Sequence, residues 1–200
     1  RIVIISTEMT EEQMVSRILG NLTGVHPFRI LSKNFRPGEE EVVEIYRPQV
    51  EAKPILIYDD VYEVGDIETV FRKADLQGGI DIGFIDYVQN CKVKDASSPY
   101  QEGSLMAKRF QQMAKDVRCC LICLSQLSND VGRGNTDQLE YKGAGEWSAV
   151  ADVGVMLDRN KKVPHELRYH VKKNRHGKLA RADFEYKADF TRLEETFLRQ

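Results

Sequence analysis

The chain has 200 residues, of which 42% are hydrophobic and 30% are charged, and its formal net charge is −2. This composition is typical of one globular domain with a sizeable core, and it excludes a polybasic chain that binds nucleic acid over its whole surface. No apolar run reaches the roughly 18 residues that a membrane-spanning helix needs, so we expect no contact with a membrane.

The first part of the chain alternates apolar strands with helical segments. Hydrophobic spacing and turn residues predict, in chain order, a strand at 2–6, helices at 10–24 and 36–52, a strand at 54–60, a helix at 64–79 and a strand at 80–89. Asp66 is expected to cap the helix at 64–79. Near-continuous apolar strands that alternate with helices indicate an α/β fold with a mostly parallel sheet flanked by helices.

Towards its end, the second part of the chain changes from strands that alternate with helices to consecutive strands. It predicts, in chain order, a polar loop at 91–104, a helix at 105–117, a buried strand at 119–126, a long polar loop at 127–146, and strands at 152–160, 166–174 and 181–189. Short turns separate the last three strands, which we therefore expect to be antiparallel. A loop as long as 127–146 in a compact domain is usually functional or disordered.

Glu8, Asp86 and Gln126 stand at the carboxyl ends of predicted strands. Ligands of parallel sheets bind beyond those ends. There a carboxylate can support Mg²⁺ beside a triphosphate, a second one can activate water, and an amide can sense the γ-phosphate. One acid after a strand is often only a helix cap, but three polar residues on successive strands favour a nucleotide site.

Two other groups could bind metal ions. Asp59 and Asp60 also end a strand, but a turn and the start of the next helix explain them more simply than a two-metal site does. Cys120 and Cys123 form a C-x-x-C. Because residues three apart on a strand point to opposite faces, we interpret all four cysteines as buried thiols.

A nucleotide-hydrolysing domain with a parallel sheet of this kind uses a G-x-x-x-x-G-K-[ST] loop to hold phosphates. The one Gly-Lys pair of this sequence, Gly177-Lys178, is followed by leucine and has no glycine five residues ahead of it. Residues 1–200 therefore contain no such loop.

Five segments fall in the order of the motifs of a known family: VIISTEMTEEQMVSRIL, IGFIDYVQ, CLICLSQLS, GAGEWSAVADVGVMLDRN and VKKNRHGKL. Over nearly all of residues 1–187 the chain resembles the C-terminal, RecA-like ATPase domain of DnaB-type replicative helicases. The resemblance implies a RecA-like P-loop NTPase core with antiparallel strands at its C-terminal end. In this family the strand and helix that flank the P-loop (the Walker A motif) come before the strand that ends in the acid. Residues 1–200 are therefore expected to be a partial single domain that lacks this strand and helix. Such a fragment is expected to be inactive alone.

Residues of this chain that match the family's motifs are expected to have the roles that those motif residues have in the family. Glu8 matches the catalytic base, Asp86 the Walker B aspartate that supports Mg²⁺, and Gln126 the residue that links the γ-phosphate to the DNA-binding loops. KKNRHG resembles the Lys-x-Arg-x-Gly element, which implies that Lys173 and Arg175 reach the nucleotide of a neighbouring subunit. Without the family, the same stretch would be interpreted as a solvated basic hairpin.

The region 127–146 resembles the family's mobile loop region that binds single-stranded DNA. Lys142, Gly143 and Gly145 occupy matching positions, and Arg133 is a further candidate. The family usually has Arg-Glu where this chain has Lys142-Gly143. Lysine still neutralises a phosphate, but without the bidentate fork of arginine. Trp147 stands where the family has an apolar residue that packs a helix, so we interpret it as core.

The resemblance implies an ATP- and Mg²⁺-dependent replicative DNA helicase that moves 5′–3′ on single-stranded DNA as a homohexamer. Primase and a helicase loader are candidate partners, and the expected location is the bacterial cytoplasm, whether the gene is cellular or from a phage. Two alternatives stay open: a RecA-like recombinase or circadian-type ATPase, and a P-loop-free domain that binds DNA or a loader. The Lys-x-Arg element favours the helicase.

Overall fold

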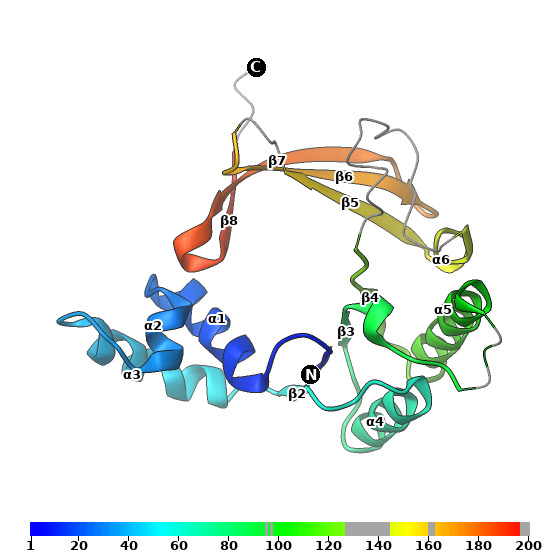
Figure 1. The fold of residues 1–200 in the computed structure, drawn as a ribbon, viewed down its shortest axis with the longest axis horizontal. Coiled ribbons are helices and arrows are strands. Elements are labelled where there is room, and N and C mark those ends of the chain that lie inside the picture. Colours follow the sequence, from blue (N-terminus) through cyan, green and yellow to red (C-terminus); the bar gives the residue numbers. More distant parts are fainter. Residues whose placement is uncertain (95, 97, 127–144, 160–162, 197–200) are drawn as a thin grey trace. The chain divides into compact units, whose positions relative to one another are not determined.

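The computed structural model describes residues 1–94, 96, 98–126, 145–159 and 163–196 (Figure 1). The chain forms two compact units. The first unit contains Arg1–Glu11 and Pro54–Ala151, and the second unit contains Glu12–Lys53 and Asp152–Gln200. That all 200 residues make up one domain stays a prediction. Within the described part, no helix has both the length and the apolar character that crossing a membrane requires.

A four-stranded parallel sheet with the order β2-β1-β3-β4 forms the centre of the first unit. The strands are β1 (Ile2–Ser6), β2 (Ile55–Tyr58), β3 (Ile82–Asp86) and β4 (Cys120–Cys123). The register places Ser6 opposite Asp86 at the ends of β1 and β3. The parallel sheet predicted from the apolar strands is confirmed, and the carboxyl ends of β1, β3 and β4 are neighbours.

Helices cover this sheet through apolar stripes. They are α4 (Val64–Leu76) and α5 (Pro99–Asp116), whereas the short α6 (Gly145–Val150) packs against α5. Val64, Ile67 and Phe71 of α4 recur at helical spacing, and all three side chains are fully buried in the core of this unit. Phe71 lies so close to Gly83 of β3 that a Cβ there would be 2.4 Å from its ring. Only glycine therefore fits at that position.

The starts of two helices differ from their predictions. α5 begins at Pro99 and not at residue 105, because the hydroxyl oxygen of Ser98 accepts the N–H of Gln101 at 3.2 Å and caps an earlier turn. α4 begins directly after Glu63, so the prediction that Asp66 caps it is wrong. Asp66 lies in the first turn instead, where a negative charge complements the helix dipole.

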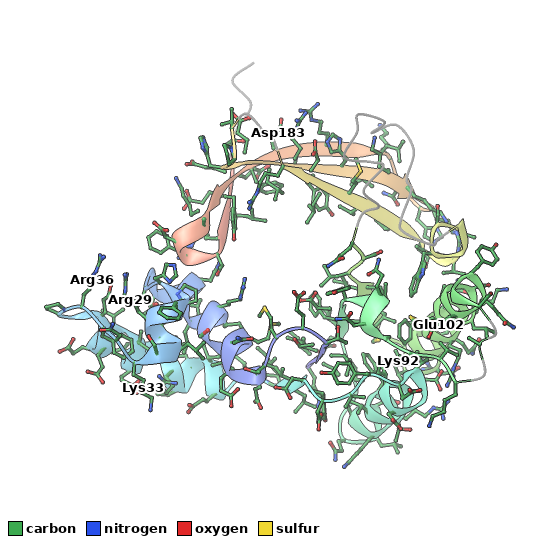
Figure 2. All side chains as sticks on the ribbon, in the orientation of Figure 1. Arg29, Lys33, Arg36, Lys92, Glu102 and Asp183 are labelled. Atoms are coloured by element: carbon green, nitrogen blue, oxygen red, sulfur yellow. The ribbon has the colours of Figure 1, made fainter. Side chains whose placement is uncertain are left out.

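Three helices belong to the second unit, in which α1 takes part from Glu12 onward: α1 (Glu11–Thr23), α2 (Pro27–Ser32) and α3 (Glu39–Glu51). Leu19, Ile30 and Val43, one from each helix, form their shared core. The short α2 was not predicted; it starts with proline, which suits a first helical position. Arg29 of α2, labelled in Figure 2, pairs at 2.9 Å with Glu39, the first residue of α3.

The second unit also contains a four-stranded antiparallel sheet with the order β5-β6-β7-β8. Its strands are β5 (Val153–Arg159), β6 (Glu166–Asn174), β7 (Ala180–Lys187) and β8 (Arg192–Glu195). The three antiparallel strands predicted for this region are confirmed, and β8 is an addition. In β6, Leu167, Tyr169 and Val171 alternate with basic residues and histidine, which is the period of a sheet with one apolar face.

Candidate functional site

The structure brings Glu8, Asp86 and Gln126 to one edge of the parallel sheet. Asp86 is the last residue of β3, opposite Ser6, and Glu8 lies two residues beyond Ser6. Gln126 follows β4, the neighbour of β3 on its other side. Glu8 and Gln126 are exposed and Asp86 is half-buried. Two carboxylates and an amide from three adjacent strands therefore share the edge at which parallel sheets bind ligands.

Thr7 ties the ends of β1 and β3 together. Its N–H donates to the carbonyl oxygen of Asp86 at 2.6 Å, and its hydroxyl lies 3.0 Å from the same oxygen. The N–H of Tyr87 donates back to the Thr7 hydroxyl at 3.0 Å. Thr7 is only 7% exposed, so these bonds are shielded from water. The residue that precedes Glu8 thus fixes the peptide group that joins Asp86 to Tyr87.

Ser6 shapes the bend that presents Glu8. Its hydroxyl donates to the carbonyl oxygen of Met9 at 2.6 Å and accepts the N–H of Met9 at 3.2 Å. Ser6 is 1% exposed, and its side chain closes the turn from inside. The sequence prediction singled out Glu8 and missed Ser6 and Thr7. The available signal was two small hydroxyl residues between a buried strand and an acid, a place where such side chains bond to the main chain.

Asp59, one of the two aspartates at the end of β2, contacts a helix start. Its Oδ2 accepts the N–H of Glu11, the first residue of α1, at 2.8 Å. This contact satisfies a main-chain donor that the helix itself cannot use. Asp59 is therefore a helix-start acid, as predicted, but it contacts the start of α1 and not that of the next helix, α4.

The cysteines differ in exposure. Cys91 is buried, Cys119 and Cys123 are partly buried, and Cys120 is exposed, so the prediction of a buried thiol is wrong at Cys120. The reason is that β4 is an outermost strand of the described parallel sheet and pairs there with β3 alone. Burial raises the pKa of the Cys91 and Cys123 thiols to about 12. Both thiols keep their protons at neutral pH and are poor metal ligands.

The strand-end groups fit a magnesium ion bound together with a nucleotide. Among the described residues, no cluster of three or more His, Cys, Asp or Glu side chains could hold a metal ion by itself. Mg²⁺ does not need such a cluster, because it typically takes one or two protein carboxylates and fills its other positions with phosphate oxygens and water. Asp86, and Glu8 beyond the end of the adjacent strand, carry carboxylate oxygens of that kind.

Lys173 and Arg175 lie in the second unit. Lys173 is in β6, paired with Gly154 at a bulge of β5, and Arg175 directly follows the strand. The N–H of Arg175 donates to the carbonyl oxygen of Asp152 at 2.8 Å, and its Nη1 lies 2.6 Å from Oδ1 of Asp152. The side chains of Arg175 and Asp152 are 46% and 60% exposed. The main chain of Arg175 is thus anchored while its guanidinium faces solvent.

Of the predicted DNA-binding residues, only Gly145 lies in the part of the chain that the structure describes. Arg133, Lys142 and Gly143 lie outside the described residues, and Gly145 is the first residue of α6. Trp147 of α6 packs against the core of the first unit, with its ring centroid 6.1 Å from that of Phe110. Trp147 therefore packs against the core as predicted, but its side chain is only partly buried.

Comparisons with known proteins identify the family. Residues 1–195 match the DnaB-like helicase C terminal domain. A probable plasmid replicative DNA helicase of Chlamydia trachomatis is 28% identical over 186 residues, which cover 90% of this chain and 40% of that protein. The chain therefore spans less than half the length of this curated relative.

Two solved structures share the fold. The first, described as an ATPase domain, superposes with a TM-score of 0.88 at 18% identity, covering 98% of this chain and 74% of that one. The second, a DnaB-like replicative helicase described with its interactions with primase, superposes with a TM-score of 0.86 at 18% identity, covering 96% and 51%. The predicted RecA-like fold is confirmed: a parallel sheet with helices, and antiparallel strands at the C-terminal end.

Proposed function

The chain belongs to the family of DnaB-like helicase C-terminal domains, and on that premise we propose that it is part of the motor of an ATP-dependent replicative DNA helicase. The motor would move 5′–3′ along single-stranded DNA as a homohexameric ring. The observation that carries the proposal is the shared edge of β1, β3 and β4, where Glu8, Asp86 and Gln126 meet. Membership of this family favours the helicase over the recombinase alternative.

Each group at this edge has a distinct task. Asp86 supports Mg²⁺, which with ATP supplies the reactive γ-phosphate and neutralises charge on its oxygens. Glu8 orients the attacking water and accepts its proton, as an exposed carboxylate held by a rigid bend can do. Gln126 hydrogen-bonds the γ-phosphate and reports whether it is present. Thr7 keeps Glu8 and Asp86 in register, since it bonds to the peptide group that joins Asp86 to Tyr87.

Lys173 and Arg175 serve the nucleotide of a neighbouring subunit. An arginine that lies beside the transferred phosphoryl group and stabilises its negative charge accelerates hydrolysis about 10³–10⁵-fold. The support for this role is the Lys-x-Arg spacing and the exposed guanidinium, anchored through the main chain to Asp152. A site shared between subunits makes hydrolysis depend on ring assembly.

Single-stranded DNA contacts Arg133, Lys142, Gly143 and Gly145, mainly through its phosphates and without sequence preference. The reaction takes place in the bacterial cytoplasm, where the helicase works beside primase and a loader. One related structure is described with its interactions with primase, which makes primase the better supported of the two partners.

Residues 1–200 alone are expected to be inactive, because they contain no G-x-x-x-x-G-K-[ST] loop to hold the phosphates. The test is a titration of a fluorescent ATP analogue with Mg²⁺. It compares residues 1–200 with a version extended upstream in the reading frame through a P-loop, called here the P-loop-containing protein.

We expect binding only by the P-loop-containing protein, and ATP turnover by that protein which Glu8→Gln removes. Micromolar binding by residues 1–200 alone would show that the phosphates are held differently. Undiminished turnover in the Glu8→Gln variant would contradict the role of Glu8. An upstream frame without a P-loop would favour the interaction domain.

A further inference from the structure

Gln89 stands where the main-chain pairing of β3 and β4 gives way to a turn. The pairing continues as far as two bonds, from the Leu124 N–H to the Ile85 oxygen (2.9 Å) and from the Val88 N–H to the Leu124 oxygen (3.0 Å). There the chain leaving β3 enters the 3₁₀ helix η1 (Val88–Asn90). Gln89 is the middle residue of η1, directly beside the residues that follow β4.

The Gln89 side chain takes over as the pairing partner of Gln126. Its Oε1 accepts the N–H of Gln126 at 3.3 Å, and its Nε2 donates to the carbonyl oxygen of Gln126 at 3.2 Å. The same Nε2 donates to the hydroxyl of Ser125 at 2.8 Å. A carboxamide offers the donor and acceptor of a peptide group. The two glutamines therefore exchange bonds as a residue pair in a β-ladder does, which holds the main chain at Gln126.

The next residue makes a matching contact on the other side of β3. Nδ2 of Asn90 donates to the carbonyl oxygen of Thr7 at 3.2 Å, and Thr7 directly precedes Glu8. A main-chain bond from Asn90 to Tyr87 closes η1 at 3.2 Å. Two consecutive carboxamides on one short turn thus reach the end of β4 and the end of β1. The turn thus bonds to Gln126 and to Thr7, the residue before Glu8.

We propose that Gln89 is a positioning residue: it holds Gln126 at the phosphate-binding edge and couples Gln126 to Glu8 through η1. This inference rests on the phosphate-sensing role proposed above for Gln126. Both glutamines are exposed, so water competes for their hydrogen bonds and the bonds add little to stability. Their effect is on where Gln126 lies. Misplacing a group that acts in the transition state lowers the rate more than ground-state affinity.

The first test compares Gln89→Ala with Gln112→Ala in the P-loop-containing protein. Gln112 is an exposed glutamine of α5 whose Nε2 bonds to Asp116 of the same helix at 2.7 Å, so the control makes the same chemical change away from the site. We expect Gln89→Ala to lower kcat for ATP about 10–100-fold, as loss of a supporting hydrogen bond at a site typically does, with KM unchanged. Gln112→Ala is expected to match the parent.

A second measurement does not depend on ATP turnover. Amide hydrogen exchange at Gln126 should be faster in Gln89→Ala, because the N–H of Gln126 loses its acceptor. Gln89→Glu keeps an oxygen acceptor for this N–H but loses the donor to Ser125 and to the Gln126 carbonyl. It is therefore expected to protect the amide more than Gln89→Ala does and to give an intermediate kcat.

Gln126→Ala and the double variant separate the possible failures. If both single variants lower kcat and the double variant lowers it no further, the two residues act as one unit and the proposal is supported. If Gln126→Ala lowers kcat but Gln89→Ala does not, Gln89 is not the positioning residue and only this inference falls. If Gln126→Ala has no effect, the sensing role of Gln126 fails and the inference is overturned with it.

Discussion

The two sets of proposed catalytic residues are held in different ways. At the edge of the parallel sheet, Ser6 and Thr7 are 1% and 7% exposed and bond to the main chain around Glu8 and Asp86. In the second unit, Arg175 is 46% exposed and forms an ion pair with Asp152, itself 60% exposed. Buried hydrogen bonds give one geometry, whereas an exposed ion pair is worth only about 0–1 kcal/mol and is easily exchanged.

This difference suits the two tasks. In the proposed mechanism the carboxylates act on water and metal within their own subunit, so a fixed position favours the rate. In the proposed ring, an arginine that serves another subunit would exchange its own aspartate partner for the phosphates of the neighbour's nucleotide. A weak carboxylate contact keeps its side chain ordered without preventing that exchange. The following predictions, from the largest expected effect to the smallest, test this contrast.

Arg175→Ala should lower kcat for ATP in the P-loop-containing protein about 10³–10⁵-fold, because the transferred phosphoryl group loses a positive partner. Arg168→Ala is the matched control: Arg168 of β6 also pairs with an aspartate, Asp158, at 3.4 Å. Steady-state kinetics measure both. Rings that mix Arg175→Ala with Glu8→Gln subunits should regain activity, since intact sites then form between unlike subunits. Mixed rings as inactive as their parents would exclude action across the interface.

Glu8→Gln should lower kcat about 10²–10⁴-fold, because the amide cannot accept a proton from the attacking water. Nucleotide affinity is expected to stay the same, as the carboxylate and the amide have the same size. Glu12→Gln, an exposed neighbour in the first turn of α1, is the control. Single-turnover hydrolysis and ATP-analogue binding separate the two effects. An equal loss of binding and turnover would show that Glu8 holds the nucleotide instead.

Thr7→Val should lower the free energy of unfolding by about 1–3 kcal/mol, because it leaves buried main-chain groups at Asp86 and Tyr87 without the hydroxyl partner. Thr69→Val in α4 removes an exposed hydroxyl that bonds to Gly65 at 2.9 Å, and should cost about 0.5 kcal/mol or less. Urea denaturation measures both variants. Equal losses would mean that Thr7 does not stiffen the site more than a surface threonine stiffens a helix.

Asp152→Asn should change the free energy of unfolding by about 0–1 kcal/mol, as expected of an exposed pair. Its kcat should fall by less than that of Arg175→Ala, because the guanidinium is still present but less well oriented. Asp158→Asn breaks the comparable pair with Arg168 and should leave kcat unchanged. A loss as large as that of Arg175→Ala would show that Asp152 does more than orient Arg175.

Local patterns predicted the elements that carry the site. The apolar runs that end in Ser6, Asp86 and Gln126 indicated strands, and their alternation with helices indicated a parallel sheet. Helix starts were predicted less well. The cap at Ser98 and the turn before α2 depend on side chain to main chain bonds that hydrophobic spacing does not reveal. The exposure of Cys120 was missed because a single strand does not show whether it lies at a sheet edge.

The sequence by itself determined that polar groups would stand at the ends of buried strands, because the two-residue period of a strand and the polarity of its ends are local properties. Only the tertiary structure decided which of these ends are neighbours. Distant parts of the chain are joined by the strand order β2-β1-β3-β4 and by the bonds of Thr7 to residues 79 and 80 positions away. The hydrogen bonds between Gln89 and Gln126 also join distant parts of the chain. Strand pairing sets such contacts, and no local pattern encodes them.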